Sequence, residues 1–226
     1  MAIRPVFVSI TEPPYFKEVE VEFDYHNGFA LIQKQASIRS LHQAFLKRNP
    51  DATVLEVSTK SENPLGARLS AFNLMFYSDV YNGSFHIENI FQSSKVFEFG
   101  GPYRDLLYVS PKDAKTDDRL KTSGRLLEFD YACEKWPLEP KTMFYDWINI
   151  NALKQNETLT NEIMSYDAFT DIEFNPKKSI NCQARSAAMF VGLKKANQLD
   201  KALKTSAGMM TVYNEGQQNT EQLSFL

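Results

Sequence analysis

Val80–Tyr103, with the sequence VYNGSFHIENIFQSSKVFEFGGPY, is the stretch around which we expect the chain to be organised, because it has its own beginning, body and end. Asn82-Gly83 favours a tight turn, since both residues tolerate a positive φ, and Ser84 can cap a helix that follows. The pair Gly100-Gly101, followed by a proline, is typical of a helix end. Between these signals, apolar residues recur on one face of a helix: Ile87, Ile90, Phe91 and Phe97. We therefore predict a helix that starts at Ile87 and ends at the glycine pair.

Three polar residues lie together beside the apolar face of this predicted helix. Glu88, Gln92 and Lys95 occupy positions i, i+4 and i+7, within a narrow arc. Glu88 and Lys95 are two turns apart, about 10 Å along the axis, so they cannot easily pair but can face one bound molecule. A solvated helix edge has the same spacing. The scarcity of other charges in the stretch, and the buried stripe beside the pair, favour a binding site.

The motif resembles the NADAR family (NAD- and ADP-ribose-associated proteins), in which a glycine turn precedes an aromatic residue and a Glu-x-x-Phe-Gln-x-x-Lys helix. The matching residues are Gly83, Phe85, Glu88, Phe91, Gln92 and Lys95. Shorter matches flank them at Ser70–Asn73, Asp167–Asp171 and Ala184-Arg185. The resemblance spans about Leu65 to Lys195 and is closest to the branch that accompanies DarT-type DNA ADP-ribosyltransferase toxins as an antitoxin.

The resemblance implies an ADP-ribosyl glycohydrolase that frees a modified nucleobase, guanine in DNA above all, through a lysine Schiff base. It implies no cofactor. The catalytic residues would be Lys95, Glu88 and Asp171, and the substrate-binding residues Asn73, Gln92, Gly101, Trp147 and Arg185. The partners would be ADP-ribose on nucleic acid and a DarT-type toxin.

The acidic segment Tyr166–Pro176 has its own chemical signal. Asp167, Asp171 and Glu173 fall within seven residues of an otherwise apolar stretch. Such acids repel one another, and burial would raise the pKa of one of them. The alternative is an exposed acidic loop, at about even odds.

Three further residues allow both a structural and a functional interpretation. Asn73 lies among apolar residues and must be either a core bridge or a ligand contact. Trp147 belongs to an aromatic helical stripe, which is more often core than a stacking platform for a base. Arg185 has a planar guanidinium that matches phosphate oxygens, so it could clamp a diphosphate.

Two other functions are compatible with the same residues. One is an N-glycosidase acting on a small phosphorylated metabolite of the riboflavin-pathway type. The other is a non-catalytic antitoxin that neutralises its toxin by contact. The additional segment of residues 1–64 favours a macromolecular substrate over a metabolite.

Composition excludes several classes of protein. The chain has 226 residues and a net charge of −3, so no general positive field would hold nucleic acid. Cys133 and Cys182 are far apart and fit no metal spacing, which indicates free thiols in a reducing cytoplasm. The scattered histidines add no metal site. No apolar run is long enough to span a bilayer, so no membrane association is expected.

Periodicity predicts an α+β, helix-rich single domain with a small, mostly antiparallel sheet, although strands interleaved with helices also fit a parallel one. The predicted strands lie near residues 4–10, 17–23, 53–58, 69–77 and 125–131, and the other helices near 37–48, 111–122, 141–153 and 179–195. The 111–122 helix is polar nearly all round, so we expect its charges to be solvated. We expect the chain to have three parts. Residues 1–64 form an N-terminal extension packed on the core, residues 65–204 form the NADAR-like core, and residues 205–226 form a flexible polar tail.

Overall fold

Strands from distant parts of the sequence meet in one four-stranded sheet, in the order β2-β1-β9-β3. In this computed structural model, which describes the backbone of residues 1–224 and the side chains of residues 1–217, β1 (Ala2–Ser9) and β2 (Phe16–Phe23) form an antiparallel hairpin. β9 (Ala168–Thr170) is antiparallel to β1 and parallel to β3 (Val54–Glu56). The predicted α+β fold is confirmed, and the β3–β9 pair adds a parallel connection to it.

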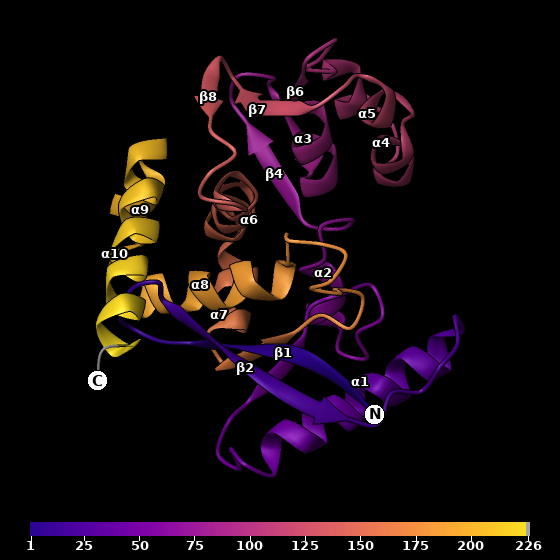
Figure 1. Cartoon of the computed structure of the whole chain (residues 1–226), viewed down its shortest axis with the longest axis vertical. Coiled ribbons are helices and arrows are strands. Elements are labelled where there is room, and N and C mark those ends of the chain that lie inside the picture. Colours follow the sequence, from indigo (N-terminus) through magenta and orange to yellow (C-terminus); the bar gives the residue numbers. More distant parts are fainter. Residues whose placement is uncertain (225–226) are drawn as a thin grey trace.

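A helix packs on each face of this sheet (Figure 1). On one face, α1 (Leu31–Leu46) buries Ile38, Leu41 and Phe45 in a cluster with side chains of β1 and β2. On the other lies α8 (Gln183–Lys195). Gly192 allows α8 to approach the β1–β2 connection, because a Cβ there would stand 2.1 Å from the Tyr15 carbonyl oxygen.

Two smaller sheets lie farther along the molecule. β4 (Met75–Ser78) pairs with β5 (Gly83–His86), and β6 (Lys95–Phe97) pairs with β7 (Leu126–Tyr131), which pairs in turn with β8 (Glu134–Trp136). All of these pairings are antiparallel. The β7–β8 turn holds Ala132 and Cys133 at φ values of 55° and 63°, as a tight hairpin turn requires.

The other described helices surround a core rich in aromatic residues. They are α2 (Pro64–Arg68), α3 (Ile87–Ser93), the 3₁₀ helix η1 (Arg104–Tyr108), α4 (Pro111–Thr116), α5 (Arg119–Thr122), α6 (Met143–Gln155), α7 (Glu157–Ile163), α9 (Leu199–Leu203) and α10 (Ser206–Ser224). The middle of this core is α6, where Trp147 and Phe144 pack against Trp136 of β8 at ring distances of 4.9 and 5.4 Å. None of the described helices is both long enough and apolar enough to cross a membrane.

The organising stretch has its predicted helix start, because α3 begins at Ile87, but it differs on either side. Before the helix, Gly83–His86 pairs with β4, so Ser84 lies in a strand and His86 precedes α3 without a side-chain cap. The helix then ends at Ser93, because Lys95–Phe97 pairs with β7. Lys95 is therefore a strand residue rather than a helix residue.

Other boundaries also moved. The predicted strand 69–77 begins only at Met75, and the predicted helix 111–122 divides into α4 and α5 at Asp117, whose ψ of 127° is not helical. The helix expected at 37–48 starts at Leu31, while the one expected at 179–195 starts at Gln183. Local spacing identified these elements, but long-range strand pairing and local turns set their ends.

The expected flexible tail is instead a helix as far as the chain is described. Within α10, Met209 and Val212 are buried, and with Tyr213 they form an i, i+3, i+4 stripe that the polar composition concealed. Residues 225–226 lie outside the described part of the chain. The division at residue 64 stays a prediction.

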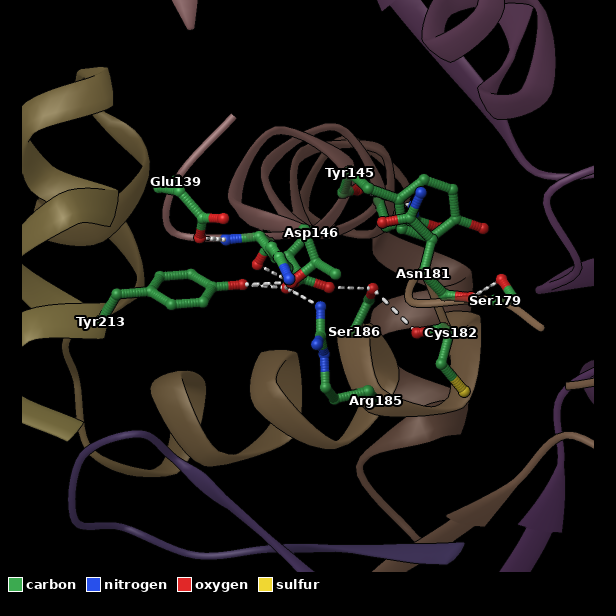
Figure 2. Close-up of polar contacts among 12 residues, drawn as sticks. Glu139, Tyr145, Asp146, Ser179, Asn181, Cys182, Arg185, Ser186 and Tyr213 are labelled. Atoms are coloured by element: carbon green, nitrogen blue, oxygen red, sulfur yellow. Dashed lines mark hydrogen bonds and ion pairs between the residues drawn. The ribbon is translucent and has the colours of Figure 1, made fainter. Parts of the chain in front are cut away.

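Asp146 of α6 connects three helices through one buried carboxylate (Figure 2). It accepts hydrogen bonds from Arg185 at 2.5 Å, from Ser186 at 2.6 Å and from the Tyr213 hydroxyl. Arg185 and Ser186 belong to α8 and Tyr213 to α10, so the carboxylate joins both helices to α6. A buried charge of this kind is stable only when it is paired and hydrogen-bonded.

We predict that this cluster stabilises the fold strongly. Asp146→Ala leaves the Arg185 guanidinium buried without its partner, which should lower the free energy of unfolding by about 3–5 kcal/mol. Tyr213→Phe removes one hydrogen bond to a charged group and should cost about 1.5–3 kcal/mol. Urea denaturation measures both. The exposed Tyr108→Phe serves as a control with little effect, and wild-type stability of Tyr213→Phe would show that α10 is not held by Asp146.

Candidate functional site

A cleft of about 680 Å³ lies where the segment after β3 meets α3, α4, α6 and the chain between β9 and α8. Its lining includes Glu88 and Asp171, two of the predicted catalytic residues, together with Tyr145. Residues 58–60, from the N-terminal segment, form part of the wall. The volume is within the range of small-molecule binding sites, about 300–1,000 Å³.

Glu88 and Gln92 form one polar unit on α3. Gln92 Nε2 donates to Glu88 Oε1 at 2.7 Å, and both side chains are buried. The backbone amide of Glu88 donates to the carbonyl oxygen of Ala71, which fixes the start of the helix. Gln92 Oε1 is buried without a hydrogen-bond partner. Gln92 is not one of the residues that line the cleft, so in this structure it supports Glu88 from the neighbouring turn of α3.

Lys95 lies at the start of β6, where it is partly buried and is not one of the residues that line the cleft. Its Nζ is 4.7 Å from the centroid of the Phe91 ring. Burial lowers the pKa of Lys95 to about 8; nearby Glu88 opposes this shift, and Lys115 adds to it. A substantial fraction of the amine is therefore neutral near pH 7.5. A neutral lysine is a nucleophile, whereas an ordinary surface lysine is not.

Asp171 lies at the cleft in front of a second buried acid, Glu56 of β3. Asp171 Oδ1 accepts hydrogen bonds from the amides of Glu173 and Phe174 at 3.0 and 3.2 Å. Burial, and then the charge of Glu56, raise the pKa of Asp171 to about 8. Near neutral pH this carboxyl group is mostly protonated and can serve as an acid.

Two cleft residues were missed by the sequence analysis. The ring of Tyr145 lies edge-on to Phe91 at 5.2 Å, and burial, with Glu88 and Asp171 nearby, raises the pKa of Tyr145 well above its ordinary value. Lys115 of α4 stands 3.8 Å from Glu88 Oε2 and 5.0 Å from the ring centroid of Phe72. Lys115 is exposed, as expected of the charges in the 111–122 segment, but it also lines the cleft beside Glu88. In the sequence, the hydroxyl-bearing aromatic residue Tyr145 stands next to Asp146, and this pattern could have indicated a polar site. No comparable local pattern indicated Lys115.

Asn73 and Gly101 do not line the cleft. Asn73 is exposed in the turn before β4, where its side-chain amide donates to the carbonyl oxygen of Ala67 at 2.9 Å. Gly101 has a φ of 81°, and a Cβ there would stand 2.3 Å from the carbonyl oxygen of Lys95. Gly101 thus allows the chain to pass closely behind Lys95, and Asn73 braces a turn.

Trp147 and Arg185 are likewise held away from the cleft lining. Trp147 packs in the aromatic core, and its indole nitrogen donates to the carbonyl oxygen of Leu203 at 3.2 Å. The Arg185 guanidinium is engaged with Asp146 (Figure 2). The geometry gives both residues a structural position, in place of the base-stacking and diphosphate roles expected of them.

In the described residues, no group of three or more His, Cys, Asp or Glu side chains is arranged to hold a metal ion. Cys133 is exposed and Cys182 buried, and neither forms a disulfide.

Comparison with known protein families gives a match over nearly the whole chain. A family model described as the DarT1-associated NADAR antitoxin matches residues 2–223. The match includes the N-terminal strands and α10, well beyond the stretch from Leu65 to Lys195 in which the resemblance was seen. A search of curated proteins found no match.

The raised pKa of Asp171 predicts a pH-dependent stability. The folded protein binds this proton more tightly than the unfolded chain, where the pKa of an Asp is about 4. The stabilisation is complete below about pH 4 and is lost as the pH rises through about 8. We expect the wild-type melting temperature to fall between about pH 5 and 8.5, and Asp171→Asn to show a shallower fall. The exposed Asp51→Asn should keep the wild-type slope; an unchanged slope in Asp171→Asn would refute the assignment.

Proposed function

The chain belongs to the family of DarT1-associated NADAR antitoxins, and from this we propose that it is an enzyme that removes ADP-ribose from nucleobases modified by an ADP-ribosyltransferase toxin. The proposed substrate is ADP-ribosylated guanine in DNA. The reaction is hydrolysis of the bond between a base nitrogen and the anomeric carbon of the ribose. Its products are the repaired base and free ADP-ribose.

The proposed mechanism has a covalent intermediate on lysine. The neutral amine of Lys95 attacks the anomeric carbon, the bond from that carbon to the base nitrogen breaks, and a proton passes to the departing nitrogen. Opening of the ribose ring gives a Schiff base between the lysine and ADP-ribose. Water then adds to the imine carbon, releasing ADP-ribose and regenerating the amine, so the net reaction consumes one water molecule.

The observation that carries this proposal is a partly buried amine with a lowered pKa, within electrostatic reach of a cleft that contains two carboxyl groups. The pKa of Lys95, lowered to about 8 by burial, suits a nucleophile near neutral pH. Both residues whose charges act on Lys95, Glu88 and Lys115, line the cleft. A lysine at a solvated surface would keep its ordinary pKa and would not interact with charged residues of the cleft.

Asp171 and Glu88 would move the protons. Asp171, with a pKa of about 8, is suited to protonate the leaving nitrogen. Glu88, held by Gln92, is suited to take a proton from the attacking amine or from water. Gln92 would act by holding Glu88 in place, since it does not itself line the cleft.

The diphosphate requires positive charge, which Arg185 cannot supply while it is paired with Asp146. Three lysines line the cleft instead: Lys60, Lys115 and Lys178. We assign the diphosphate to these lysines on charge complementarity. Lys60 comes from the N-terminal segment, which would then take part in substrate binding.

Reduction during turnover tests the covalent step. Borohydride added while the protein acts on an ADP-ribosylated DNA oligonucleotide should leave an ADP-ribose adduct on Lys95, identified by mass spectrometry of its peptide. The reason is that borohydride reduces an imine to a stable amine. The control is Lys121→Arg, at an exposed lysine paired with Asp118, which should still label at Lys95. An active wild-type enzyme that gives no adduct would contradict the Schiff base.

Substitution of Lys95 tests its chemical role separately. Lys95→Ala should lower turnover by about 10³-fold or more while the circular dichroism spectrum stays unchanged. Lys95→Arg should be equally inactive, because a guanidinium stays protonated near neutral pH. Near-wild-type turnover by Lys95→Arg would show that Lys95 only supplies charge. If Lys95→Ala still protects cells from the toxin, the protein acts by binding rather than by hydrolysis.

A further inference from the structure

We propose that Glu56 is a positioning residue for the glycohydrolase activity proposed above, on which this inference rests: from behind the cleft, its carboxylate keeps the one proton of a buried acid pair on Asp171. Glu56 belongs to β3, in the N-terminal segment, and is 2% exposed. It is the acid in a short strand that is otherwise apolar. A buried carboxyl group in such a strand costs stability unless it is fully hydrogen-bonded.

Three donors converge on the Glu56 carboxylate. Ser58 Oγ donates to Oε1 at 2.6 Å, and the amide of Ile172 donates to the same oxygen at 2.8 Å. Thr170 Oγ1 donates to Oε2 at 2.6 Å. Both oxygens of Glu56 are therefore occupied as acceptors. Burial raises the pKa of Glu56, and these three hydrogen bonds oppose that shift and favour the ionised carboxylate. Ser58 also lines the cleft, so the cluster reaches the site.

A histidine extends this chain of hydrogen bonds away from the cleft. His42 Nε2 is 2.8 Å from Thr170 Oγ1, and burial lowers the pKa of His42 to about 4. The ring is therefore neutral near pH 7. Because the single hydroxyl proton of Thr170 goes to Glu56, the Nε2–H of His42 donates to Thr170. In this chain, His42 donates a hydrogen bond to Thr170 and Thr170 donates one to Glu56. Glu56 therefore acts only as an acceptor and does not need to be protonated.

Asp171 is the member of the pair that is left to hold the proton. Two consecutive amides donate to Asp171 Oδ1 at 3.0 and 3.2 Å, and the Gln183 side chain also forms a hydrogen bond with this carboxyl group. The three bonds to Glu56 are shorter, at 2.6 to 2.8 Å, so Glu56 is the better-stabilised anion. Two carboxylates in dry surroundings cannot both ionise easily, so they titrate as a coupled pair with one shared proton. With Glu56 satisfied as the anion, Asp171 takes the proton, and Asp171 is the member that lines the cleft.

Other charged and titratable groups face the pair but do not replace Glu56. Those acting on Asp171 or Glu56 are Tyr145 and Cys182, both protonated near neutral pH because burial raises their pKa, and Glu173, which is paired with Lys34 of α1 at 3.0 Å. The lysines across the cleft are Lys60, Lys115 and Lys178. Glu56 remains the largest charge acting on Asp171.

The chemical purpose of this arrangement follows from the leaving group. An amine nitrogen of a nucleobase leaves as a neutral group only if it receives a proton as the bond to the ribose breaks. An ordinary Asp would be ionised at neutral pH and could not provide one. Glu56 would thus let Asp171 act as the acid.

The pH dependence of kcat/KM for Glu56→Gln tests the proposal. Removing the negative charge should ionise Asp171 at lower pH, so that the alkaline limb moves down by one unit or more while the acid limb, assigned to Lys95, stays in place. Near pH 8.5, kcat/KM of Glu56→Gln should be at least tenfold lower than that of the wild type. Near pH 6, it should stay within about threefold of the wild-type value. Glu62→Gln, at an exposed glutamate paired with Arg39, is the matched control and should keep both limbs. A uniform loss at all pH values would show a merely structural role and overturn the proposal.

A second readout does not depend on turnover. The carboxyl carbon of Asp171, followed by NMR in protein labelled with ¹³C at aspartate, should titrate at least one pH unit lower in Glu56→Gln than in wild type. Should that variant not fold, Ser58→Ala, which removes one donor from Glu56, should lower the Asp171 midpoint in the same direction. An unmoved midpoint refutes the role of Glu56. A wild type that shows neither hydrolysis nor a Lys95 adduct refutes the proposed function instead, whatever the midpoint.

Discussion

The fold depends on the solvation of one buried charge, that of Asp146. Its carboxylate lies in the first turn of α6 with no exposure to water, and most of the groups that replace water come from α8 and α10. Removing a carboxylate from water costs several kcal/mol in real proteins, so the ionised side chain is tolerated only when both helices are in place. Arg185 and Ser186 thus tie the start of α8 to α6, and α8 in turn covers one face of the sheet formed by the N-terminal strands.

The candidate site and this ion pair have different functions, although some of their residues are neighbours in the sequence. Tyr145 and Asp146 are neighbours on α6; the first lines the cleft and the second holds the helices together. The segment between β9 and α8 has a comparable double role, since Asp171 faces the cleft while Ile172 binds Glu56. Acidic groups and lysines both line the cleft, so a substrate that carries a diphosphate and a sugar finds positive charge and proton donors within one volume.

Local patterns in the sequence predicted those parts of the fold that local interactions determine. The alternation in β2 and the aromatic run of α6 identified both elements, and the i, i+4 spacing of Glu88 and Gln92 identified a pair that is hydrogen-bonded in the structure. Pairings between distant segments were beyond such reasoning. Gly83–His86 carries turn and cap signals, yet a ladder with β4 decides its conformation. For Arg185, the sequence shows a residue suited to phosphate but not the buried Asp146 that occupies it. The helical stripe of α10 was hidden because only a few apolar residues stand among many polar ones.

The position of β9 has a consequence for biosynthesis. This strand lies between β1 and β3 in the sheet, although more than a hundred residues separate it from either of them in the chain. The ribosome therefore delivers the two outer neighbours first and the strand that joins them much later. Contacts of such long sequence separation form slowly, because loop closure must precede them. Until Ala168–Thr170 has been synthesised, β3 has no partner, Glu56 and Asp171 cannot meet, and a nascent or truncated chain holds no complete cleft. Any protective effect that depends on the cleft thus requires a chain translated at least as far as Gln183, the last residue that lines it.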